Sequence, residues 1–359
     1  MKKNHGGNIY SIVREYGIPA DEIIDFSVNL NPMGTPQAIK KMITESMDGI
    51  MHYPDPEYTE CRESIAAYHN LPYKYITAGN GATELIFLYC RIIKPARTLV
   101  VAPTFSEYSR ALEAVGSGIN YFRLEEEDEF RPDIDSLNKE ISRGYDLVVI
   151  CNPNNPTGTL FSKKEILSIA EHGARTGCRI LLDESFMEFA FNGGNLSTVI
   201  ENDIPFNIFV IRSLTKILSL PGLRIGYGVS ADEELNIELA EQKEPWSINV
   251  FAAKAPCYIL KDLNYFEETR RVVAEENEFL ATNLAKFEWL KTFSSPANYI
   301  ILKILNHMTS PHLGESLLKK KILIRDASNF MFLDEKFIRI AVKDRESNRM
   351  LIDALSEIN

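Results

Sequence analysis

Short apolar runs alternate with stretches of helical periodicity between residues 75 and 229. The runs carry almost no charge, which is typical of strands that are buried on both faces of a parallel sheet. The pattern therefore predicts an α/β fold with a mostly parallel sheet that is covered by helices on both faces. Strands are expected at residues 75–78, 98–101, 147–150, 179–182, 209–212 and 223–229, and helices at 83–93, 106–114 and 164–172.

The pattern changes after Pro245. A long polar helix is expected over residues 266–286, and short strands are expected at 299–302 and 337–340. This succession is typical of a smaller α+β domain. Residues 1–45 show no regular pattern and are expected to pack against that domain. The predicted organisation is an N-terminal arm at 1–45, a large domain at 46–245 and a small C-terminal domain at 246–359.

Composition and charge exclude several classes of partner. The chain has 359 residues and a formal net charge of −11, whereas non-specific nucleic-acid binding requires a basic surface. Its five cysteines show neither a CxxC motif nor Cys/His metal spacing, so reduced core thiols are expected. The basic start of the chain is not followed by an apolar core, so a secretory signal is not expected, and no apolar run reaches the ~20 residues of a membrane span. A cytoplasmic protein without metal, nucleic-acid or membrane partners is therefore expected.

Lys216 has the surroundings of a Schiff-base lysine. It follows an apolar run, it has hydroxyl groups beside it in Ser213 and Thr215, and Arg224 comes eight residues later. Upstream, Asp183 closes another predicted strand. An aldehyde cofactor with a phosphate and a pyridine nitrogen needs such partners. Lysine supplies the amine, hydroxyls and arginine hold the phosphate, and aspartate keeps the ring nitrogen protonated.

Two loops at predicted strand ends are candidates for binding the same ligand. Gly79-Asn80-Gly81 opens a helix whose N–H groups would suit a phosphate, although a GxG motif read alone is more often a tight structural turn. The segment from Asn152 to Gly158 places three asparagines where ligands bind in parallel sheets, which favours a binding role. Ser213-Leu214-Thr215-Lys216 also matches the S-x-x-K motif of serine acyltransferases, but their S-D-N and K-T-G motifs do not occur here.

Together these segments resemble the fold-type I enzymes that use pyridoxal 5′-phosphate, in the aminotransferase class I and II superfamily. The resemblance covers nearly the whole chain, and the motifs follow the family's order. It implies a mostly parallel, seven-stranded type of sheet in a large cofactor domain, with a smaller α+β C-terminal domain. The motifs are Tyr53-Pro54-Asp55, Gly81-Ala82-Thr83, Pro103-Thr104-Phe105, Asn152 to Gly158, Asp183-Glu184, Ser213 to Lys216, Arg224 and Arg339.

Position by position, the resemblance implies a complete cofactor site. Lys216 would form the Schiff base and later move protons, and Asp183 would pair with the protonated pyridine nitrogen. Asn155 would hydrogen-bond the 3′ oxygen, and Phe105 would stack on the ring. Tyr53 would reach the cofactor phosphate from a partner subunit, which implies a homodimer with shared active sites. The other phosphate ligands would be Ala82, Thr83, Ser213 and Arg224.

One position departs from the family pattern. Many relatives have a tyrosine three residues after the aspartate, where this chain has Phe186. A hydrogen bond to the 3′ oxygen would then be absent, and Asn155 would carry that contact alone. The pKa of the Schiff base is expected to be somewhat higher as a result.

Two branches of the superfamily fit best: histidinol-phosphate aminotransferase and the threonine-phosphate decarboxylase of cobalamin biosynthesis. Residues 5–8 (HGGN), 25–34 (DFSVNLNPMG) and 245–249 (PWSIN) resemble the decarboxylase, as do Phe105 and Phe186. That resemblance implies that Arg339 binds the substrate carboxylate. It also implies a set of residues near the substrate phosphate, namely His5, Asn31 and Arg325.

The expected substrate is accordingly a small phosphorylated amino acid. L-Threonine O-3-phosphate would give an amino-alcohol phosphate, and L-serine O-phosphate is a close competitor because a methylene-sized difference is worth only ~1–3 kcal/mol. Histidinol-phosphate transamination is the alternative reaction. A non-catalytic protein that binds pyridoxal phosphate is the second alternative, and the intact lysine, aspartate and arginines argue against it.

Overall fold

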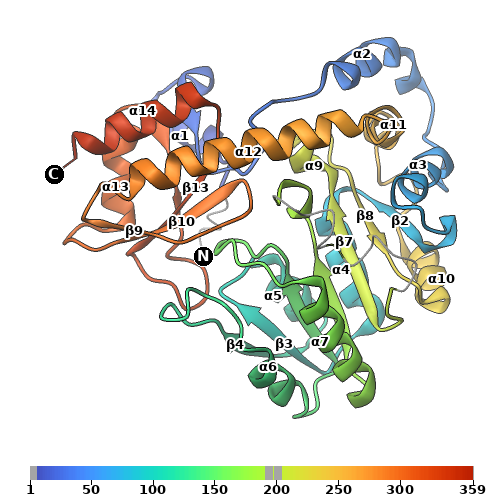
Figure 1. Ribbon diagram of the computed structural model, residues 1–359. Helices are drawn as coiled ribbons and strands as arrows, with labels where there is room; N and C mark the ends of the chain where they lie inside the picture. The colour runs from blue at the N-terminus through green and yellow to red at the C-terminus, as the bar shows by residue number, and fades with distance from the viewer. Residues whose placement is uncertain (1–5, 191–196, 198–203, 359) are drawn as a thin grey trace.

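The computed structural model describes residues 6–190, 197 and 204–358, and a seven-stranded sheet forms the centre of its larger part (Figure 1). β8 runs antiparallel to both neighbours, and the remaining neighbours are parallel, so the predicted mostly parallel sheet is confirmed. The strand order is β2 (Ile76–Gly79), β8 (Gly226–Val229), β7 (Ile208–Ser213), β6 (Arg179–Asp183), β5 (Leu147–Cys151), β3 (Arg97–Ala102) and β4 (Gly118–Arg123).

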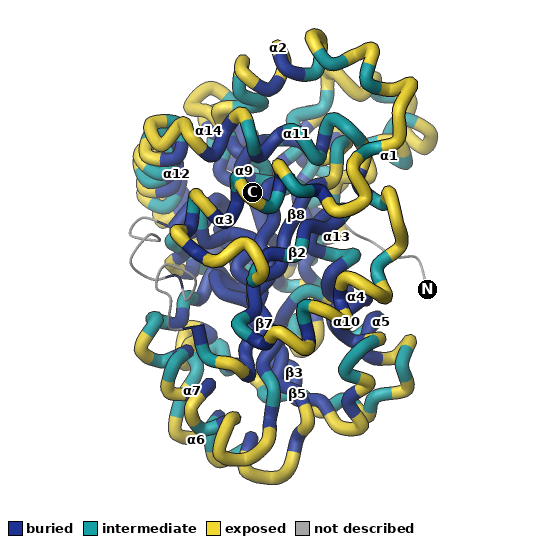
Figure 2. Tube along the Cα trace, turned by 90° about the vertical axis from the view of Figure 1, so that its right-hand side faces the viewer, coloured by how far each residue is buried: buried dark blue, intermediate teal, exposed yellow. Residues whose placement is uncertain are grey.

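Successive side chains of the central strands point to opposite faces of this sheet, and each face has its own core. In β5, Val148 and Ile150 belong to one core and Val149 belongs to the other. Burial on both faces explains the continuous apolar runs, and Figure 2 shows the strands buried inside a more exposed periphery. One face is covered by α4 (Gly81–Ile93), α5 (Glu107–Ala114) and α10 (Glu233–Gln242), and the other by α3 (Thr59–His69), α6 (Ile134–Ile141), α7 (Lys163–Thr176) and α11 (Val250–Ile259).

Local sequence signals set the ends of α7. The Ser162 side chain accepts a hydrogen bond from the N–H of Glu165, and the Glu165 carboxylate accepts one from the N–H of Ser162, which together form a capping box. The helix ends at Gly177, whose φ of 76° lies in the left-handed region that glycine adopts without strain. α7 is therefore longer at its C-terminal end than the predicted helix at 164–172.

β4 is the strand of the large sheet that the apolar pattern does not predict. It lies at the edge of the sheet, beside β3, and its residues are half-buried or exposed. Its sequence, GINYFR, mixes polar and apolar residues because only one long side of the strand is paired. An edge strand of this kind lacks the uncharged run that marks the buried strands.

A four-stranded antiparallel sheet forms the smaller part, and α12 (Leu263–Leu284) runs from the large core to it (Figure 1). Phe266 and Val273 in the first half of α12 pack in the large core, whereas Leu280 packs in the core of the small sheet. The large core thus continues beyond residue 245, where the sequence predicted the boundary. The small sheet has the order β12 (Arg325–Asp326), β13 (Phe337–Ala341), β10 (Tyr299–Ile304) and β9 (Leu290–Thr292), with α13 (Ser310–Leu318) and α14 (Arg345–Ser356) packed beside it.

The N-terminal arm is more regular than its sequence suggests. β1 (Ile24–Asp25) pairs in parallel with β11 (Ile322–Leu323), so this part of the arm lies beside the small sheet. α2 (Gln37–Glu45) instead packs on α11 through its buried side chains. The arm also contains α1 (Ile9–Tyr16) and the short 3₁₀ helix η1 (Ala20–Glu22). Beyond the arm, further short 3₁₀ helices are η2 (Met47–Met51), η3 (Tyr73–Tyr75) and η4 (Met187–Phe189).

Within the part of the chain that the structure describes, neither a helix able to cross a membrane nor a cluster of metal-ligating side chains is found. No helix there combines the length and the apolar character that crossing a bilayer requires. No group of three or more histidine, cysteine, aspartate or glutamate side chains there is arranged to hold a metal ion.

Candidate active site

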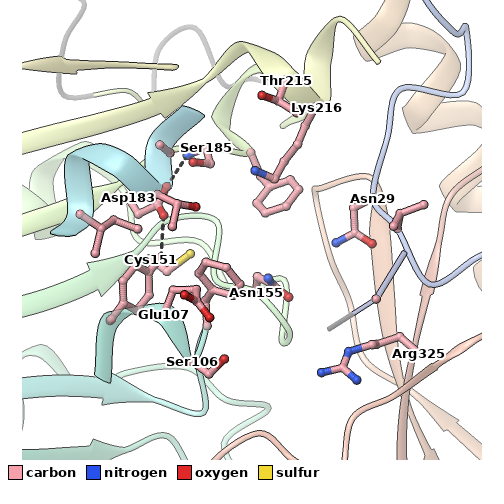
Figure 3. A pocket seen from close by; sticks show the side chains of 18 of the residues that line it. Asn29, Ser106, Glu107, Cys151, Asn155, Asp183, Ser185, Thr215, Lys216 and Arg325 are labelled. Atoms are coloured by element: carbon pink, nitrogen blue, oxygen red, sulfur yellow. Dashed lines mark hydrogen bonds between the residues drawn. The ribbon is translucent and has the colours of Figure 1, made fainter. Parts of the chain in front are cut away.

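A cavity of about 420 Å³ lies where the ends of the central strands meet the N-terminal arm and the small sheet. β5 and β6 end in it at Cys151 and Asp183, and Lys216 enters from the turn after β7. Figure 3 shows Asp183 and Lys216 on one side of the cavity and Asn29 and Arg325 on the opposite side. The carboxyl ends of parallel strands are where open α/β sheets bind ligands, so the position alone marks a candidate site.

Lys216 lies on the short helix α9 (Leu214–Ile217), directly after β7. Its Nζ donates to the Ser213 Oγ at 3.3 Å and lies 5.1 Å from the centroid of the Phe186 ring. Burial lowers the pKa of Lys216 below its usual value, and the Asp183 carboxylate offsets part of that effect. A neutral amine is the nucleophilic form, so the environment prepares Lys216 to attack a carbonyl carbon.

The lowered pKa of Lys216 predicts how capture of an aldehyde depends on pH. The rate at which the apoprotein captures pyridoxal phosphate should rise with pH and level off below the usual lysine pKa of 10.5, because the neutral amine accumulates earlier. Stopped-flow absorbance across a pH series would measure this rate. A rate that still rises through pH 10.5 would contradict the expected effect of burial.

Asp183 is held by two hydrogen bonds inside the cavity. Its Oδ2 accepts from the Tyr108 hydroxyl at 2.6 Å, and its Oδ1 accepts from the Ser185 N–H at 2.8 Å. Burial is the main cause that raises the pKa of Tyr108 well above its usual value, and the nearby Asp183 carboxylate is the second cause. Tyr108 therefore remains a donor at neutral pH. The carboxylate is therefore fixed in orientation at the end of β6.

Replacing Tyr108 by phenylalanine tests this hydrogen bond. The substitution keeps the ring and removes one donor to a buried carboxylate, a contact worth roughly 1.5–3 kcal/mol. We expect kcat/KM to fall about tenfold or more, because each 1.36 kcal/mol of transition-state stabilisation corresponds to a factor of ten. Steady-state kinetics on a cofactor-saturated variant would measure the loss, and unchanged kinetics would remove Tyr108 from the site.

A buried ion pair fixes the strand ends that carry Asp183 and Lys216. Glu184 follows Asp183, and Arg212 lies at the end of β7, four residues before Lys216. The Glu184 Oε2 accepts from the Arg212 Nε at 3.0 Å and from its Nη2 at 2.7 Å. Glu188 also accepts from the Arg212 Nη1 at 2.8 Å. These bonds hold the ends of β6 and β7 in one arrangement, which positions the two cavity side chains relative to each other.

The start of α4 forms a cradle suited to a phosphate. Ala82 and Thr83 line the cavity in the first turn of this helix, where unpaired N–H groups favour an anion. A Cβ added to Gly81, which has φ +76°, would lie 2.6 Å from the Arg224 Nη2, so the guanidinium lies directly against the helix start. Burial lowers the pKa of Arg224, and a bound anion would compensate its charge.

Asn155 and Phe105 line the same cavity between the cradle and the small sheet. The Asn155 Oδ1 accepts from the Arg339 Nη1, so the loop after β5 contacts the small sheet directly. The Phe105 ring stands edge-on to Tyr108 with 5.7 Å between the centroids. Phe186, the residue that departs from the family pattern, is buried and packs edge-on against Tyr299 at 4.9 Å.

Two buried arginines form the opposite side of the cavity. Arg325 on β12 and Arg339 on β13 are direct partners in the antiparallel register, although like charges placed opposite each other are destabilising. Burial is the main cause that lowers the pKa of Arg339 to about 9, and the charge of Arg325 is the second cause. The Arg339 Nε has no hydrogen-bond partner among the described residues, and the Arg325 Nη2 donates to the Asn329 Oδ1 at 2.7 Å. Anionic ligand groups would offset this repulsion.

The structure places one of the predicted substrate residues away from the cavity. The Asn31 side chain does not line the cavity; its Nδ2 lies 2.8 Å from the Ile217 carbonyl oxygen instead. Asn29, two residues earlier, lines the cavity, and its buried Oδ1 has no hydrogen-bond partner among the described residues. His5 lies outside the described residues, and Gly6 lines the cavity.

Tyr53 does not reach the cavity of its own chain. Its side chain is exposed and packs against Trp246, with 4.8 Å between the ring centroids. Its proposed contact with the phosphate of a partner subunit stays a prediction. Ser213 is buried beside Lys216 rather than among the cavity-lining residues.

Comparison with known proteins identifies the family. Residues 21–355 match the family model described as aminotransferase class I and II. A provisionally named threonine-phosphate decarboxylase of Caldanaerobacter subterraneus subsp. tengcongensis is 39% identical over 354 residues, 98% of this chain and 92% of that one. The threonine-phosphate decarboxylase of Salmonella typhimurium is 34% identical over 355 residues, 99% of this chain and 96% of that one. The crystal structure of the histidinol-phosphate aminotransferase from Clostridium acetobutylicum gives a TM-score of 0.86 at 32% identity, covering 93% of this chain and 98% of that chain.

The fold and these relatives define a pyridoxal-phosphate-dependent enzyme. The chain belongs to the aminotransferase class I and II family, whose members use this cofactor. The residues present fit the cofactor, because the Arg224 guanidinium lies against the start of α4, where it and the N–H groups of the first helical turn could hold a phosphate. The half-buried Lys216 and the buried Asp183 supply the amine and the carboxylate.

Proposed function

We propose that the chain holds pyridoxal 5′-phosphate on Lys216 and decarboxylates a small phosphorylated amino acid. Asp183 would pair with the ring nitrogen, Asn155 would bind the 3′ oxygen, and Phe105 would contact the ring face. Ala82, Thr83, Ser213 and Arg224 would hold the cofactor phosphate. Except for Ser213, which lies beside Lys216, these residues line one cavity at the end of the sheet, and that common location supports their roles.

The choice of reaction depends on how the chain grips the substrate. When bound, pyridoxal phosphate would supply an electron sink for the bond that breaks at the substrate Cα. Arg339 and Arg325 would choose that bond by fixing the substrate carboxylate and the distal phosphate. A grip that puts the carboxylate in the reacting position would release CO₂, whereas a grip that puts the hydrogen there would lead to transamination.

The placement of Arg325 opposite Arg339 is the observation that carries the proposal. Two buried cations at this spacing suit a ligand with two anionic groups, because each anion offsets the repulsion between the arginines. Arginine also binds carboxylate and phosphate as a planar fork. L-Threonine O-3-phosphate carries these two groups, and L-serine O-phosphate differs from it by one methyl group. The product would be (R)-1-amino-2-propanol O-2-phosphate or its serine-derived counterpart.

Incubating the holoenzyme with each candidate substrate tests this function. We expect CO₂ release from L-threonine O-3-phosphate without any 2-oxo acid, and a lower kcat/KM for L-serine O-phosphate. The similarity to the two threonine-phosphate decarboxylases supports this choice. Glutamate formed from 2-oxoglutarate and histidinol phosphate, with no CO₂ released from either phospho-amino acid, would overturn the proposal.

Histidinol-phosphate transamination is the second candidate. The similarity to the Clostridium acetobutylicum aminotransferase favours it, because the two folds superimpose over most of both chains. Histidinol phosphate has a phosphate but no carboxylate. It would therefore leave one of the two arginines without an anion, which makes it the poorer fit to the pair.

Removing Arg325 tests its proposed contact with the substrate phosphate. Arg325→Ala should raise KM for L-threonine O-3-phosphate by about 10- to 100-fold, because a charge-assisted hydrogen bond is worth roughly 1.5–3 kcal/mol. Initial rates with the holoenzyme would measure KM and kcat separately. Arg349→Ala, on α14 outside the cavity, is the matched control and should keep both constants. An unchanged KM in Arg325→Ala would assign the substrate phosphate to other residues.

A homodimer with shared sites belongs to the same proposal. Tyr53 is exposed next to Trp246, and Ile50 and Met51 beside it are also exposed. A second copy would cover this apolar surface and bring Tyr53 to the neighbouring cofactor phosphate. Sedimentation of the holoenzyme at low and high concentration would test the assembly.

A further inference from the structure

Asn31 links the N-terminal arm to the helix that carries Lys216. Its backbone N–H donates to the Lys216 carbonyl oxygen at 3.1 Å, and its Nδ2 lies 2.8 Å from the Ile217 carbonyl oxygen. These are the last two carbonyls of α9, which has only four residues, and the Lys216 carbonyl also accepts from the Ser219 N–H. Asn31 therefore caps α9 from a segment far away in sequence.

The same side chain also contacts the helix that joins the two cores. The Asn31 Nδ2 lies 2.8 Å from the Tyr265 hydroxyl oxygen and 2.9 Å from the Thr269 Oγ1, both on α12. Tyr265 in turn donates to the Ile217 carbonyl oxygen at 2.9 Å. Asn31 is 3% exposed, so no water competes for these contacts. Three elements thus meet at one buried amide: the arm, α9 and α12.

The arm is also held by side chains of the small sheet and of the segment before it, at the carbonyls of Ser27 and Leu30. The Arg339 Nη2 donates to the Ser27 carbonyl oxygen at 2.7 Å, and the Asn298 Nδ2 donates to the Leu30 carbonyl oxygen at 3.2 Å. Residues 27–31 therefore span the cavity from the carboxylate-binding arginine to the lysine helix. Asn29 lies between these two anchors and lines the cavity.

We infer that Asn31 is a positioning residue that sets the distance between Lys216 and the substrate-binding arm. It touches neither cofactor nor substrate and acts through the end of α9. This inference rests on the proposed role of Lys216, and it holds for decarboxylation and transamination alike, because both need Lys216 at the substrate Cα. It replaces the direct contact with substrate phosphate that the sequence motif implied for Asn31.

Two pairs of kinetic constants distinguish this role from substrate binding. Asn31→Ala should lower kcat by about 10- to 100-fold, the range expected when a catalytic group is misplaced by about 1 Å, and should change KM little. Asn29→Ala should instead raise KM for the phosphorylated substrate and change kcat little. A raised KM with normal kcat in Asn31→Ala would overturn the inference, and so would two unchanged constants.

A readout independent of turnover uses the apoprotein. The N–H groups of Leu218, Ser219 and Leu220 donate to carbonyls of residues 214–216. Hydrogen–deuterium exchange at these three amides should become about tenfold faster in Asn31→Ala, because losing about 1.4 kcal/mol of local stability changes an opening equilibrium by that factor. Exchange equal to that of the unmodified chain would contradict a capping role.

Tyr265→Phe provides a milder variant if Asn31→Ala does not fold. It removes the single hydroxyl that shares the Ile217 carbonyl with Asn31, so kcat should fall in the same direction by a smaller factor. Normal kcat and normal exchange in Tyr265→Phe would also overturn the inference.

If Lys216 is not the cofactor lysine, Lys216→Ala will keep the visible band of bound pyridoxal phosphate. In that case the proposed function fails, while the exchange experiment still reports on the hold of Asn31 over α9.

Discussion

Lys216→Ala is expected to abolish nearly all turnover. In the proposed function, this variant would lose both the amine that holds the cofactor and the group that moves protons at the substrate Cα. General acid–base catalysis alone contributes about 10²- to 10⁴-fold, so kcat should fall by at least about 10³-fold. Absorbance spectra and initial rates on the purified protein would show the loss of the cofactor band together with the loss of activity.

Lys243→Ala is the matched control for this experiment. Burial lowers the pKa of Lys243 as it does for Lys216, but Lys243 lies outside the cavity. The control should retain both the visible band and turnover. A retained band in Lys216→Ala, or a lost band in Lys243→Ala, would place the cofactor on another lysine.

Asp183→Ala should have the second-largest effect. Its carboxylate is the buried anion that would keep the ring nitrogen protonated, and without it the ring no longer withdraws electrons from the substrate. Removing one preorganised electrostatic partner of a transition state costs about 10²- to 10³-fold in kcat, and a loss of that size is expected here. Steady-state kinetics at saturating cofactor would measure it.

Asp183→Asn separates charge from shape in the same experiment. Asparagine keeps the size of the side chain and an acceptor for the Ser185 N–H, while it removes the negative charge. The asparagine variant should be nearly as impaired as the alanine variant, and thermal unfolding of both apoproteins should show that each is folded. Normal activity in Asp183→Asn would mean that the charge has no catalytic role.

The sequence predicts the large sheet and its ligand edge well, because both depend on local signals. Buried strands appear as uncharged runs, and Asp183 and Lys216 follow two of them directly. Parallel strands bring their carboxyl ends to one edge, so the meeting of these residues in one cavity was predictable. β4 lacked such a run because it lies at the edge of the sheet.

The small sheet and the arm depend on contacts that no local pattern encodes. Asn29 and Asn31 are two residues apart in an irregular segment, and the motif does not state which of them faces the substrate. The pairing of Arg325 with Arg339 depends on the register between β12 and β13. Tyr108 comes only three residues after Phe105, at the start of the predicted helix, and this nearness in sequence could have indicated its proximity to the site.

The bond that breaks at the substrate Cα is the central question, and isotopic labelling reads it directly. The holoenzyme would be given L-threonine O-3-phosphate with deuterium in place of hydrogen at Cα, and the product would be analysed by NMR. Decarboxylation breaks the bond from Cα to the carboxylate, so the amino-alcohol phosphate should keep the deuterium and gain one proton from solvent at the same carbon. A 2-oxo acid product, with the deuterium released to water, would contradict decarboxylation.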